Sequence, residues 1–272
     1  MAFRWITCSM ALSGGGGAST FGVAPCLRQQ RLALAERIAA RLRAQYAESL
    51  IAVGIYGSTA RNDDGPYSDL EMMAVLSEGE TRRYEWATGT CKAEVNVLSR
   101  AQARADASAL DVDWAMTHGQ FIHVLPLFDS QGVFAELRAC VYQHSRAAFD
   151  ELLREIIIGE MLELVGKWRN MAARAEFSLL AVTAVQFARQ ACWLAGAAHQ
   201  HVFSASARMF AEALALPDLP AGFDTLCARV LRGDLSDPQS VLTDCESLWQ
   251  GVVLWAERRH LQLVTDPLEL GS

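Results

Sequence analysis

The sequence of 272 residues has no long apolar run, no cluster of basic residues and no closely spaced cysteine pair. No stretch reaches the roughly 18 apolar residues that a membrane-spanning helix needs, so we expect no membrane anchor. Lysine and arginine number 24 against 31 aspartate and glutamate residues, which gives a formal charge of -7. Because a duplex nucleic-acid binder depends on clustered positive charge, this balance argues against a nucleic-acid partner.

The seven cysteines are scattered along the chain, and none belongs to a CxxC pair. An odd number without close spacing fits neither a disulfide framework nor a zinc site. We therefore expect free thiols in a reducing compartment and place the protein in the cytoplasm.

The composition is that of a globular protein, with 51% hydrophobic and 20% charged residues. At a prior of about 150 residues per domain, the length allows two domains. Residues 1–26 contain four consecutive glycines, Gly14 to Gly17, and are expected to form a flexible leader.

Hydrophobic periodicity changes its character along the chain. Residues 27–48 repeat apolar side chains every three or four positions, which predicts a helix. Apolar segments separated by turn residues then predict strands at 50–57, 69–76, 82–88, 91–98 and 121–128.

From about residue 133 the period is helical, with expected helix ends near Gly196, Pro217 to Pro220 and Gly233 to Pro238. The predicted fold class is therefore α+β. We expect an N-terminal domain with a mixed β-sheet over 27–146 and an all-α helical domain over 147–272.

The most informative segment for function is GIYGSTARNDDGPYSDLEMM, residues 54–73. A hydrophobic strand ends at Gly57, and after a polar turn a second strand opens with Asp69 and Glu71 around one leucine. Because side chains alternate along a strand, the two carboxylates project from one face. Two adjacent carboxylates repel each other unless a cation neutralises them. Their oxygens suit Mg²⁺, with nucleotide phosphates as further ligands.

Donors for phosphate oxygens are expected in the same segment. Gly57 lets the backbone turn closely, and Ser58 with the following amides can present hydrogen-bond donors. Arg61 adds a guanidinium group, and Ser68 is assigned to the same nucleotide site. A GS dipeptide alone is usually a turn, so the prediction depends on the combination with the two carboxylates.

This combination resembles the nucleotidyltransferase superfamily that includes DNA polymerase β, and more closely the kanamycin nucleotidyltransferases, the aminoglycoside 4'-O-nucleotidyltransferases. The resemblance covers about residues 27–262 and makes the first domain the nucleotidyltransferase domain. It is carried by YGSTARNDDGPYSDLEMM, EWATGTCKAEVN, DWAMTHGQF, LVGKWRN and LPAGFDTLCARVLRGDLSD. It implies transfer of AMP from Mg·ATP to the 4'-hydroxyl of kanamycin-type antibiotics, with release of pyrophosphate and resistance as the result.

The resemblance also implies roles for residues outside that segment. Glu163 matches the general base, and Lys167 matches the residue that holds the nucleotide phosphate. Glu85, Glu94 and Glu160 would pair with ammonium groups of the substrate. The family further implies a homodimer whose active site is shared between subunits.

Each of these residues also has a structural interpretation. Glu163 and Lys167 have the spacing of an exposed helical ion pair, which contributes a few tenths of a kcal/mol. Glu94 follows Lys92 on one strand face, where a cross-strand salt bridge is common. One departure from the family pattern is visible at Gly159, where the family has an acidic residue.

Two other functions stay open at the level of the sequence. A superfamily enzyme that acts on RNA ends or on a protein would carry the same carboxylates, although RNA should require a basic and aromatic surface. A catalytically idle nucleotide-binding module is the second alternative. The expected partners are therefore ATP, an aminoglycoside and a second copy of the chain, with no nucleic acid and no membrane.

Overall fold

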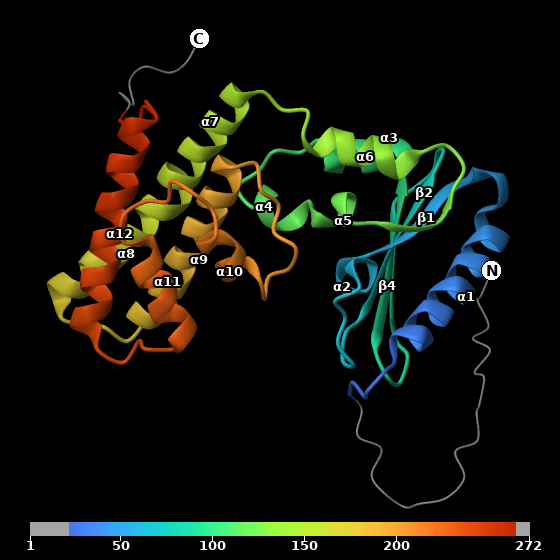
Figure 1. The fold of residues 1–272 in the computed structure, drawn as a ribbon, viewed down its shortest axis with the longest axis horizontal. Coiled ribbons are helices and arrows are strands. Elements are labelled where there is room, and N and C mark those ends of the chain that lie inside the picture. The colour runs from blue at the N-terminus through green and yellow to red at the C-terminus, as the bar shows by residue number, and fades with distance from the viewer. Residues whose placement is uncertain (1–21, 265–272) are drawn as a thin grey trace, which may run out of the picture.

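The computed structural model describes residues 22–264, which form a mixed β-sheet followed by a helical region. Figure 1 shows the sheet at one end of the molecule and the C-terminal helices at the other, so the predicted α+β fold class is confirmed. Residues 1–21, most of the predicted leader, lie outside the described residues.

The end of the predicted leader is hydrogen-bonded to the sheet region. The Ala24 amide donates to the Thr90 carbonyl at 2.9 Å. The Cys26 amide donates to the Pro66 carbonyl at 2.7 Å, and the Cys26 side chain is buried. The prediction of a flexible leader is therefore wrong for residues 24–26, because backbone hydrogen bonds tie them to the loops below the sheet.

The sheet contains five strands in the order β3-β4-β2-β1-β5. They are β1 (Leu50–Tyr56), β2 (Leu70–Leu76), β3 (Arg82–Ala87), β4 (Lys92–Ser99) and β5 (Leu125–Asp129). β2 and β4 run parallel and the other neighbours are antiparallel, which confirms the predicted mixed sheet. The first four predicted strands agree with β1 to β4 to within one residue at each end.

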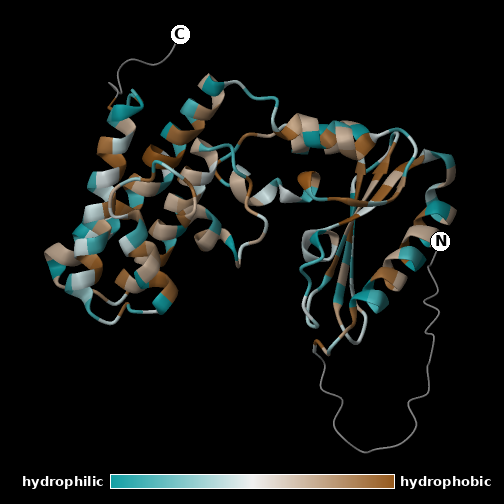
Figure 2. Ribbon diagram, in the orientation of Figure 1, coloured by the Kyte–Doolittle hydropathy of each residue, from teal (hydrophilic) through white to brown (hydrophobic). Residues whose placement is uncertain are grey.

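Helices cover both faces of this sheet. α1 (Arg28–Tyr46) packs Ala35, Ala39 and Leu42 on one face, and a 3-10 turn, η1 (Ala47–Ser49), leads from it into β1. The other face is covered by α3 (Arg100–Ala107), α5 (Gly119–Ile122) and α6 (Val133–Val141). Burial on both faces explains why β1 and β2 are nearly continuous apolar runs, coloured mainly as hydrophobic in Figure 2.

The fifth predicted strand, 121–128, is strand only in its second half. α4 (Trp114–Thr117) and α5 precede it, and β5 begins at Leu125. Phe121 and Ile122 are buried from helical positions. The prediction is wrong for 121–124 because a short apolar run does not distinguish a buried helical turn from a strand.

Arg31 is a charged residue of α1 that lies in the interior. Its side chain is buried, and its Nε donates to Asp64 Oδ2 at 3.1 Å. Arg28 also pairs with Asp64. Burial raises the pKa of Asp64, but hydrogen bonds from Arg31 and Arg28 outweigh it and hold the pKa below its ordinary value. This ion triad fastens α1 to the loop that precedes β2.

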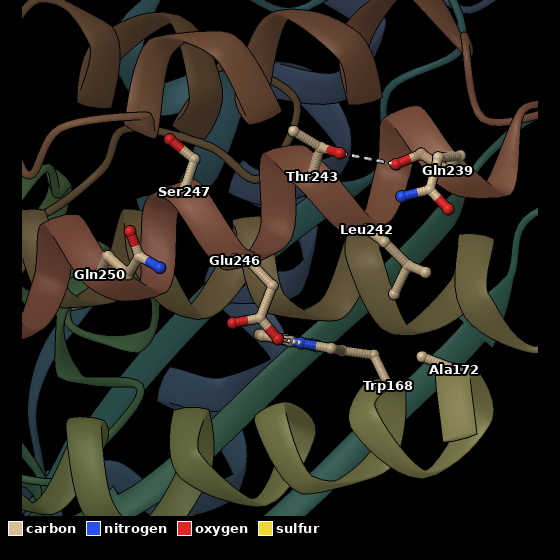
Figure 3. A pocket seen from close by; sticks show the side chains of 8 residues that line it. All are labelled: Trp168, Ala172, Gln239, Leu242, Thr243, Glu246, Ser247 and Gln250. Carbon is tan, nitrogen blue, oxygen red and sulfur yellow. Dashed lines mark hydrogen bonds between the residues drawn. The ribbon is translucent and has the colours of Figure 1, made fainter.

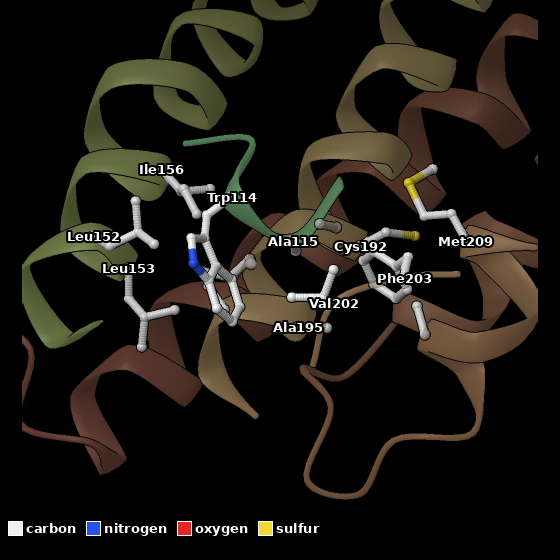
Figure 4. Close-up of a cluster of buried hydrophobic side chains, with 14 of the residues drawn as sticks. Trp114, Ala115, Leu152, Leu153, Ile156, Cys192, Ala195, Val202, Phe203 and Met209 are labelled. Carbon is white, nitrogen blue, oxygen red and sulfur yellow. The ribbon is translucent and has the colours of Figure 1, made fainter. Parts of the chain in front are cut away.

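The C-terminal region is helical, as predicted. It comprises α7 (Arg146–Glu155), the π-helical segment η2 (Ile156–Met161), α8 (Leu162–Arg174), α9 (Leu180–Ala198), α10 (Met209–Leu214), α11 (Phe223–Arg232) and α12 (Pro238–Arg258). α9 lies at the centre and contacts α7, α8, α10, α11 and α12. Figure 4 shows how Trp114 from α4 inserts among Leu152, Leu153 and Ile156, which joins the two regions in one core.

The predicted helix end near Gly196 is confirmed, because α9 ends two residues later, at Ala198. A Cβ on Gly196 would lie 2.7 Å from the Ala115 Cβ and 2.9 Å from the Phe203 ring. Glycine is required here for close packing rather than as a helix stop. Among the helices of residues 22–264, none combines the length and apolar character needed to cross a bilayer.

Candidate active site

The turn after β1 brings the backbone against a carboxylate. α2 (Gly57–Arg61) begins here, and Gly57 has a φ of 71°, a value that favours glycine. A Cβ on Gly57 would lie 1.8 Å from Glu71 Oε2. The backbone thus turns closely at Gly57, and the space beside it is taken by Glu71, so only glycine fits here.

The register of the sheet places acidic side chains in one row. Tyr56 pairs with Glu71, Glu71 with Glu94, and Glu94 with Glu85. Residues directly opposite one another in a sheet project from the same face. Asp69 lies two positions before Glu71, and Asp69, Glu71 and Glu94 line the same hollow as Ser58 and Arg61 of α2.

Glu71 experiences unfavourable electrostatics. Burial raises its pKa to about 7, and the negative charges of Asp69 and Glu94 contribute to the increase. Arg61 and Lys92 oppose the shift only in part. A divalent cation between Asp69 and Glu71 would relieve this repulsion, so the two carboxylates fit the predicted metal.

The protein alone does not complete a metal site. In the described part of the chain, no group of three or more histidine, cysteine, aspartate and glutamate side chains is arranged to hold a metal ion. Mg²⁺ commonly uses one or two carboxylates together with substrate phosphates. Asp69 and Glu71 therefore suffice only if a nucleotide supplies further oxygens.

Glu94 lies next to Glu71 but has favourable partners. Its Oε1 accepts from the Tyr56 hydroxyl at 3.0 Å, and its Oε2 accepts from Lys92 Nζ at 2.6 Å and from Arg83 Nη2 at 3.1 Å. Burial raises the pKa of Glu94, but hydrogen bonds from Lys92 and Tyr56 hold it below its ordinary value. Glu94 is therefore held as a carboxylate.

These side chains line a cleft of about 640 Å³ between the sheet and the helical region. Its lining comprises Tyr56, Gly57, Ser58, Arg61, Asp69, Glu71, Arg83, Glu94 and Asn96 from the sheet and its loops, Met116, Thr117, Gly119 and Gln120 from α4 and α5, and residues 203–206 from the helical region. Six of the predicted site residues are thus brought together: Gly57, Ser58, Arg61, Asp69, Glu71 and Glu94.

The segment 203–206 forms a wall of this cleft and is held by the helical region. The Phe203 amide donates to the Ala115 carbonyl at 2.7 Å. Glu212 on α10 accepts from the Ser204 amide at 3.0 Å and lies 3.1 Å from His201 Nε2. Arg208 then reaches across to Asp63, 3.2 Å away, in the loop after α2.

Two predicted residues lie near the cleft without lining it. The Ser68 hydroxyl accepts from the Gly65 amide at 3.0 Å and so stabilises the turn before β2. Glu85 is exposed on β3, where Arg83 and Lys92 each lie 3.0 Å from its carboxylate.

The remaining predicted residues lie elsewhere in the same chain. Glu163 and Lys167 form an ion pair of 2.7 Å on α8, with side chains 65% and 50% exposed. Glu160 accepts a hydrogen bond of 3.1 Å from Gln190. None of the three lines the cleft, and Figure 1 shows α8 on the far side of α9 from α2.

Sequence reasoning missed several residues of the cleft. Arg83 shares a strand face with Glu85, and Asn96 shares one with Glu94, so the alternation of β3 and β4 could have identified both. Tyr56 ends β1 directly before Gly57, and nothing in its local sequence distinguishes it from the buried residues of that strand. No local sequence pattern identifies residues 203–206 as a wall of the cleft, because only tertiary packing brings them to the sheet.

A second hollow lies between α8 and α12, and it contains none of the predicted site residues. Trp168 Nε1 donates to Glu246 at 2.7 Å on one side of it, as Figure 3 shows. The acidic row of the sheet lies in the other hollow, which therefore remains the candidate active site.

Known proteins resemble this chain in both regions. The family model described as the KNTase C-terminal domain matches residues 131–262. A Staphylococcus aureus and a Bacillus sp. protein, each named aminoglycoside nucleotidyltransferase (4'), are 37% identical over 232 residues, which are 85% of this chain and 92% of each relative. A solved nucleotidyltransferase-like protein from Exiguobacterium sibiricum has a TM-score of 0.49 at 11% identity, covering 82% of this chain and 77% of its own.

Proposed function

Because the chain belongs to the aminoglycoside 4'-nucleotidyltransferase family, we propose that it transfers AMP from Mg·ATP to the 4'-hydroxyl of kanamycin-type aminoglycosides. Pyrophosphate is released, and the modified antibiotic no longer acts, so the enzyme confers resistance. The single observation that supports this chemistry best is the cleft in which the backbone at Gly57 lies in close contact with the Glu71 carboxylate.

The nucleotide would bind at the α2 turn. Ser58 and Arg61 both line the cleft. Arg61 Nε has no hydrogen-bond partner within residues 22–264 and lies 3.6 Å from Asp63. Both side chains can therefore donate to phosphate oxygens without breaking a strong internal contact.

Asp69 and Glu71 would hold Mg²⁺, which would offset the charge of the triphosphate and favour departure of pyrophosphate. The raised pKa of Glu71 supports this assignment. A bound cation stabilises most strongly a carboxylate whose charged form is unfavourable in the metal-free protein. Ser68 would contribute through the turn that leads into Asp69.

The acceptor hydroxyl needs a base, since an alcohol is a poor nucleophile at neutral pH. We propose Glu163 for this role and Lys167 for stabilising charge on the transferred phosphate. Both lie outside the cleft of their own chain and are half-exposed or more. They would therefore act on the cleft of a second copy, in a homodimer with a shared site.

The acceptor's ammonium groups would meet the remaining carboxylates. Glu85 and Glu94 lie side by side at the cleft edge, and Glu160 would approach from the partner together with Glu163. We further propose the division into 27–146 and 147–272. The six described cysteines are free and buried, which supports a reducing compartment such as the cytoplasm.

The decisive experiment is mass spectrometry of an aminoglycoside panel after incubation with the purified protein, ATP and Mg²⁺. Substrates with a 4'-hydroxyl should gain one AMP mass with stoichiometric pyrophosphate, and 4'-deoxy analogues should not. Modification of RNA ends or of a protein in parallel incubations, with unmodified aminoglycosides, would contradict the proposal.

A further inference from the structure

Arg83 occupies the space between two carboxylates that the proposed function assigns to the substrate. Its Nη2 lies 3.0 Å from Glu85 Oε1 and 3.1 Å from Glu94 Oε2. Arg83 is also one of the residues that line the cleft. The guanidinium group is therefore positioned where a substrate ammonium group would have to bind.

We propose that Arg83 is a specificity-determining residue that competes with substrate ammonium groups for Glu85 and Glu94. This inference rests on the proposed function, because it needs those carboxylates to belong to the acceptor site. An acceptor must displace Arg83 before it pairs with them, so Arg83 weakens binding of aminoglycosides that place an amino group there.

The local charge balance supports this competition. Lys92 Nζ lies 3.0 Å from Glu85 Oε1 and 2.6 Å from Glu94 Oε2, the same two oxygens that Arg83 contacts. Two carboxylates are thus paired with two cations, and the edge of the cleft has no excess negative charge to attract a polycation. Removal of one cation would restore that excess.

Arg83 is the cation that can leave. Its side chain is 58% exposed, and within the described residues it makes no hydrogen bond other than those to Glu85 and Glu94. Glu94 keeps Lys92 and the Tyr56 hydroxyl when Arg83 moves into solvent. An arriving ammonium group replaces its charge and donors, so the exchange leaves no carboxylate unpaired.

The strand itself provides a matched control. β3 alternates, so Arg82 projects from the opposite face and pairs with Glu80 at 3.5 Å, away from the cleft. Arg83→Gln and Arg82→Gln remove the same charge from neighbouring positions of one strand. Any effect of net charge alone would appear in both variants.

The test is calorimetric binding of kanamycin-type aminoglycosides with different numbers of amino groups, combined with KM and kcat for AMP transfer. Arg83→Gln should lower Kd and KM about threefold to fivefold, the size expected of a surface ion pair, and the gain should shrink at high salt. kcat and the KM for Mg·ATP should stay within about twofold. Arg82→Gln and Arg83→Lys should match the wild type.

The inference is overturned if Arg83→Gln leaves Kd unchanged or raises it, or if Arg82→Gln gives the same gain. Thermal melting of both variants shows whether each is folded, and Arg83→Lys supplies a second comparison if Arg83→Gln is not. A wild-type protein that binds aminoglycosides but transfers no AMP would contradict the proposed function instead, while calorimetry still decides the role of Arg83.

Discussion

At the scale of single residues, two adjacent glutamates of one sheet row have opposite electrostatics. Burial raises the pKa of Glu71 to about 7, whereas Glu94 keeps a pKa below its ordinary value despite its burial. The difference arises from the neighbours, because Lys92 and Tyr56 donate to Glu94 and no side chain donates to Glu71 at hydrogen-bond distance among the described residues. The same residue type therefore differs in its ionisation at two neighbouring positions, which fits the proposed roles of Glu71 as a metal ligand and Glu94 as an ammonium partner.

Neutralising either proposed metal ligand should abolish activity without lowering the stability of the fold. Asp69→Asn and Glu71→Gln should each reduce AMP transfer to background, while the melting temperature without metal stays equal or rises, because repulsion within the acidic row decreases. Steady-state turnover and thermal melting with and without Mg²⁺ measure both effects. Wild-type turnover in both variants at saturating Mg²⁺ would disprove the metal assignment.

The Gly57 turn makes a second prediction at this scale. Gly57→Ala adds a Cβ at 1.8 Å from Glu71 Oε2 and forces a positive φ on alanine, so ATP binding should fall at least tenfold. Gly65→Ala is the matched control, because a Cβ there meets nothing within 4 Å. Calorimetry with ATP and Mg²⁺ compares the two. Equal affinity in both variants would show that the close contact is unimportant.

At the scale of elements, the sequence predicts best where periodicity is long and local. β1 to β4 and α1 follow directly from their apolar patterns, and the turn between Gly57 and Asp69 identifies one side of the cleft. The features that the sequence does not predict depend on packing between segments far apart in the chain. Neither the burial of Arg31 against Asp64 nor the close contact of Gly196 with Ala115 has a signal within its own helix.

The π-helical segment shows another limit of pattern reading. An α-helical period correctly predicts that Leu153, Ile157 and Met161 are buried. Ile156–Met161 nevertheless forms a π-helix, which shifts the angular position of the residues that follow it. Counting 3.6 residues per turn from Leu153 therefore does not give the direction in which the Glu163 side chain projects.

The ion triad that fastens α1 should control the stability of the first domain. Asp64→Asn leaves Arg31 buried without its counter-charge and should lower the free energy of unfolding by about 3 kcal/mol at pH 7. The pKa of Asp64 in the folded protein lies below its ordinary value of 3.8, so its contribution is present above that pH and is lost as the pH falls through the folded value.

Urea unfolding at pH 7 and at pH 3 tests this prediction. The difference between wild type and Asp64→Asn should be large at pH 7 and should shrink at pH 3. Asp63→Asn, one position earlier, is the control and should cost under about 1 kcal/mol, because its partner Arg208 is exposed and Arg61 Nε lies 3.6 Å from it, beyond hydrogen-bond distance. A pH-independent difference would mean that the triad is not the cause.

At the scale of the whole molecule, the proposed base and the proposed metal ligands lie in different parts of one chain. The Glu163 side chain is exposed on α8, and Asp69 and Glu71 line the cleft. A single copy therefore does not assemble all proposed catalytic groups. This separation, rather than any contact seen in the structure, is the reason to propose a shared site.

Subunit mixing tests that proposal. Glu163→Gln should reduce turnover about a hundredfold or more with little change in ATP binding, because base catalysis typically contributes 10² to 10⁴. Mixing Glu163→Gln with Asp69→Asn subunits should restore part of the activity, since some hybrid dimers would contain one intact site. Sedimentation should show a dimer, and a fully active monomer or no recovery after verified exchange would contradict the shared site.

The wall at 203–206 gives the cleft a property that its sheet residues alone do not have. Nearly 150 positions separate Ser58 from Ser204, and both line the same hollow. The complete cleft therefore requires both regions, because Glu212 of the helical region must hold the wall in place. A fragment that ends at residue 146 would retain the GS turn and both proposed metal ligands, yet it would lack the wall at 203–206. Binding of a ligand that contacts this wall would consequently report on the folding of both regions and not of the sheet region alone.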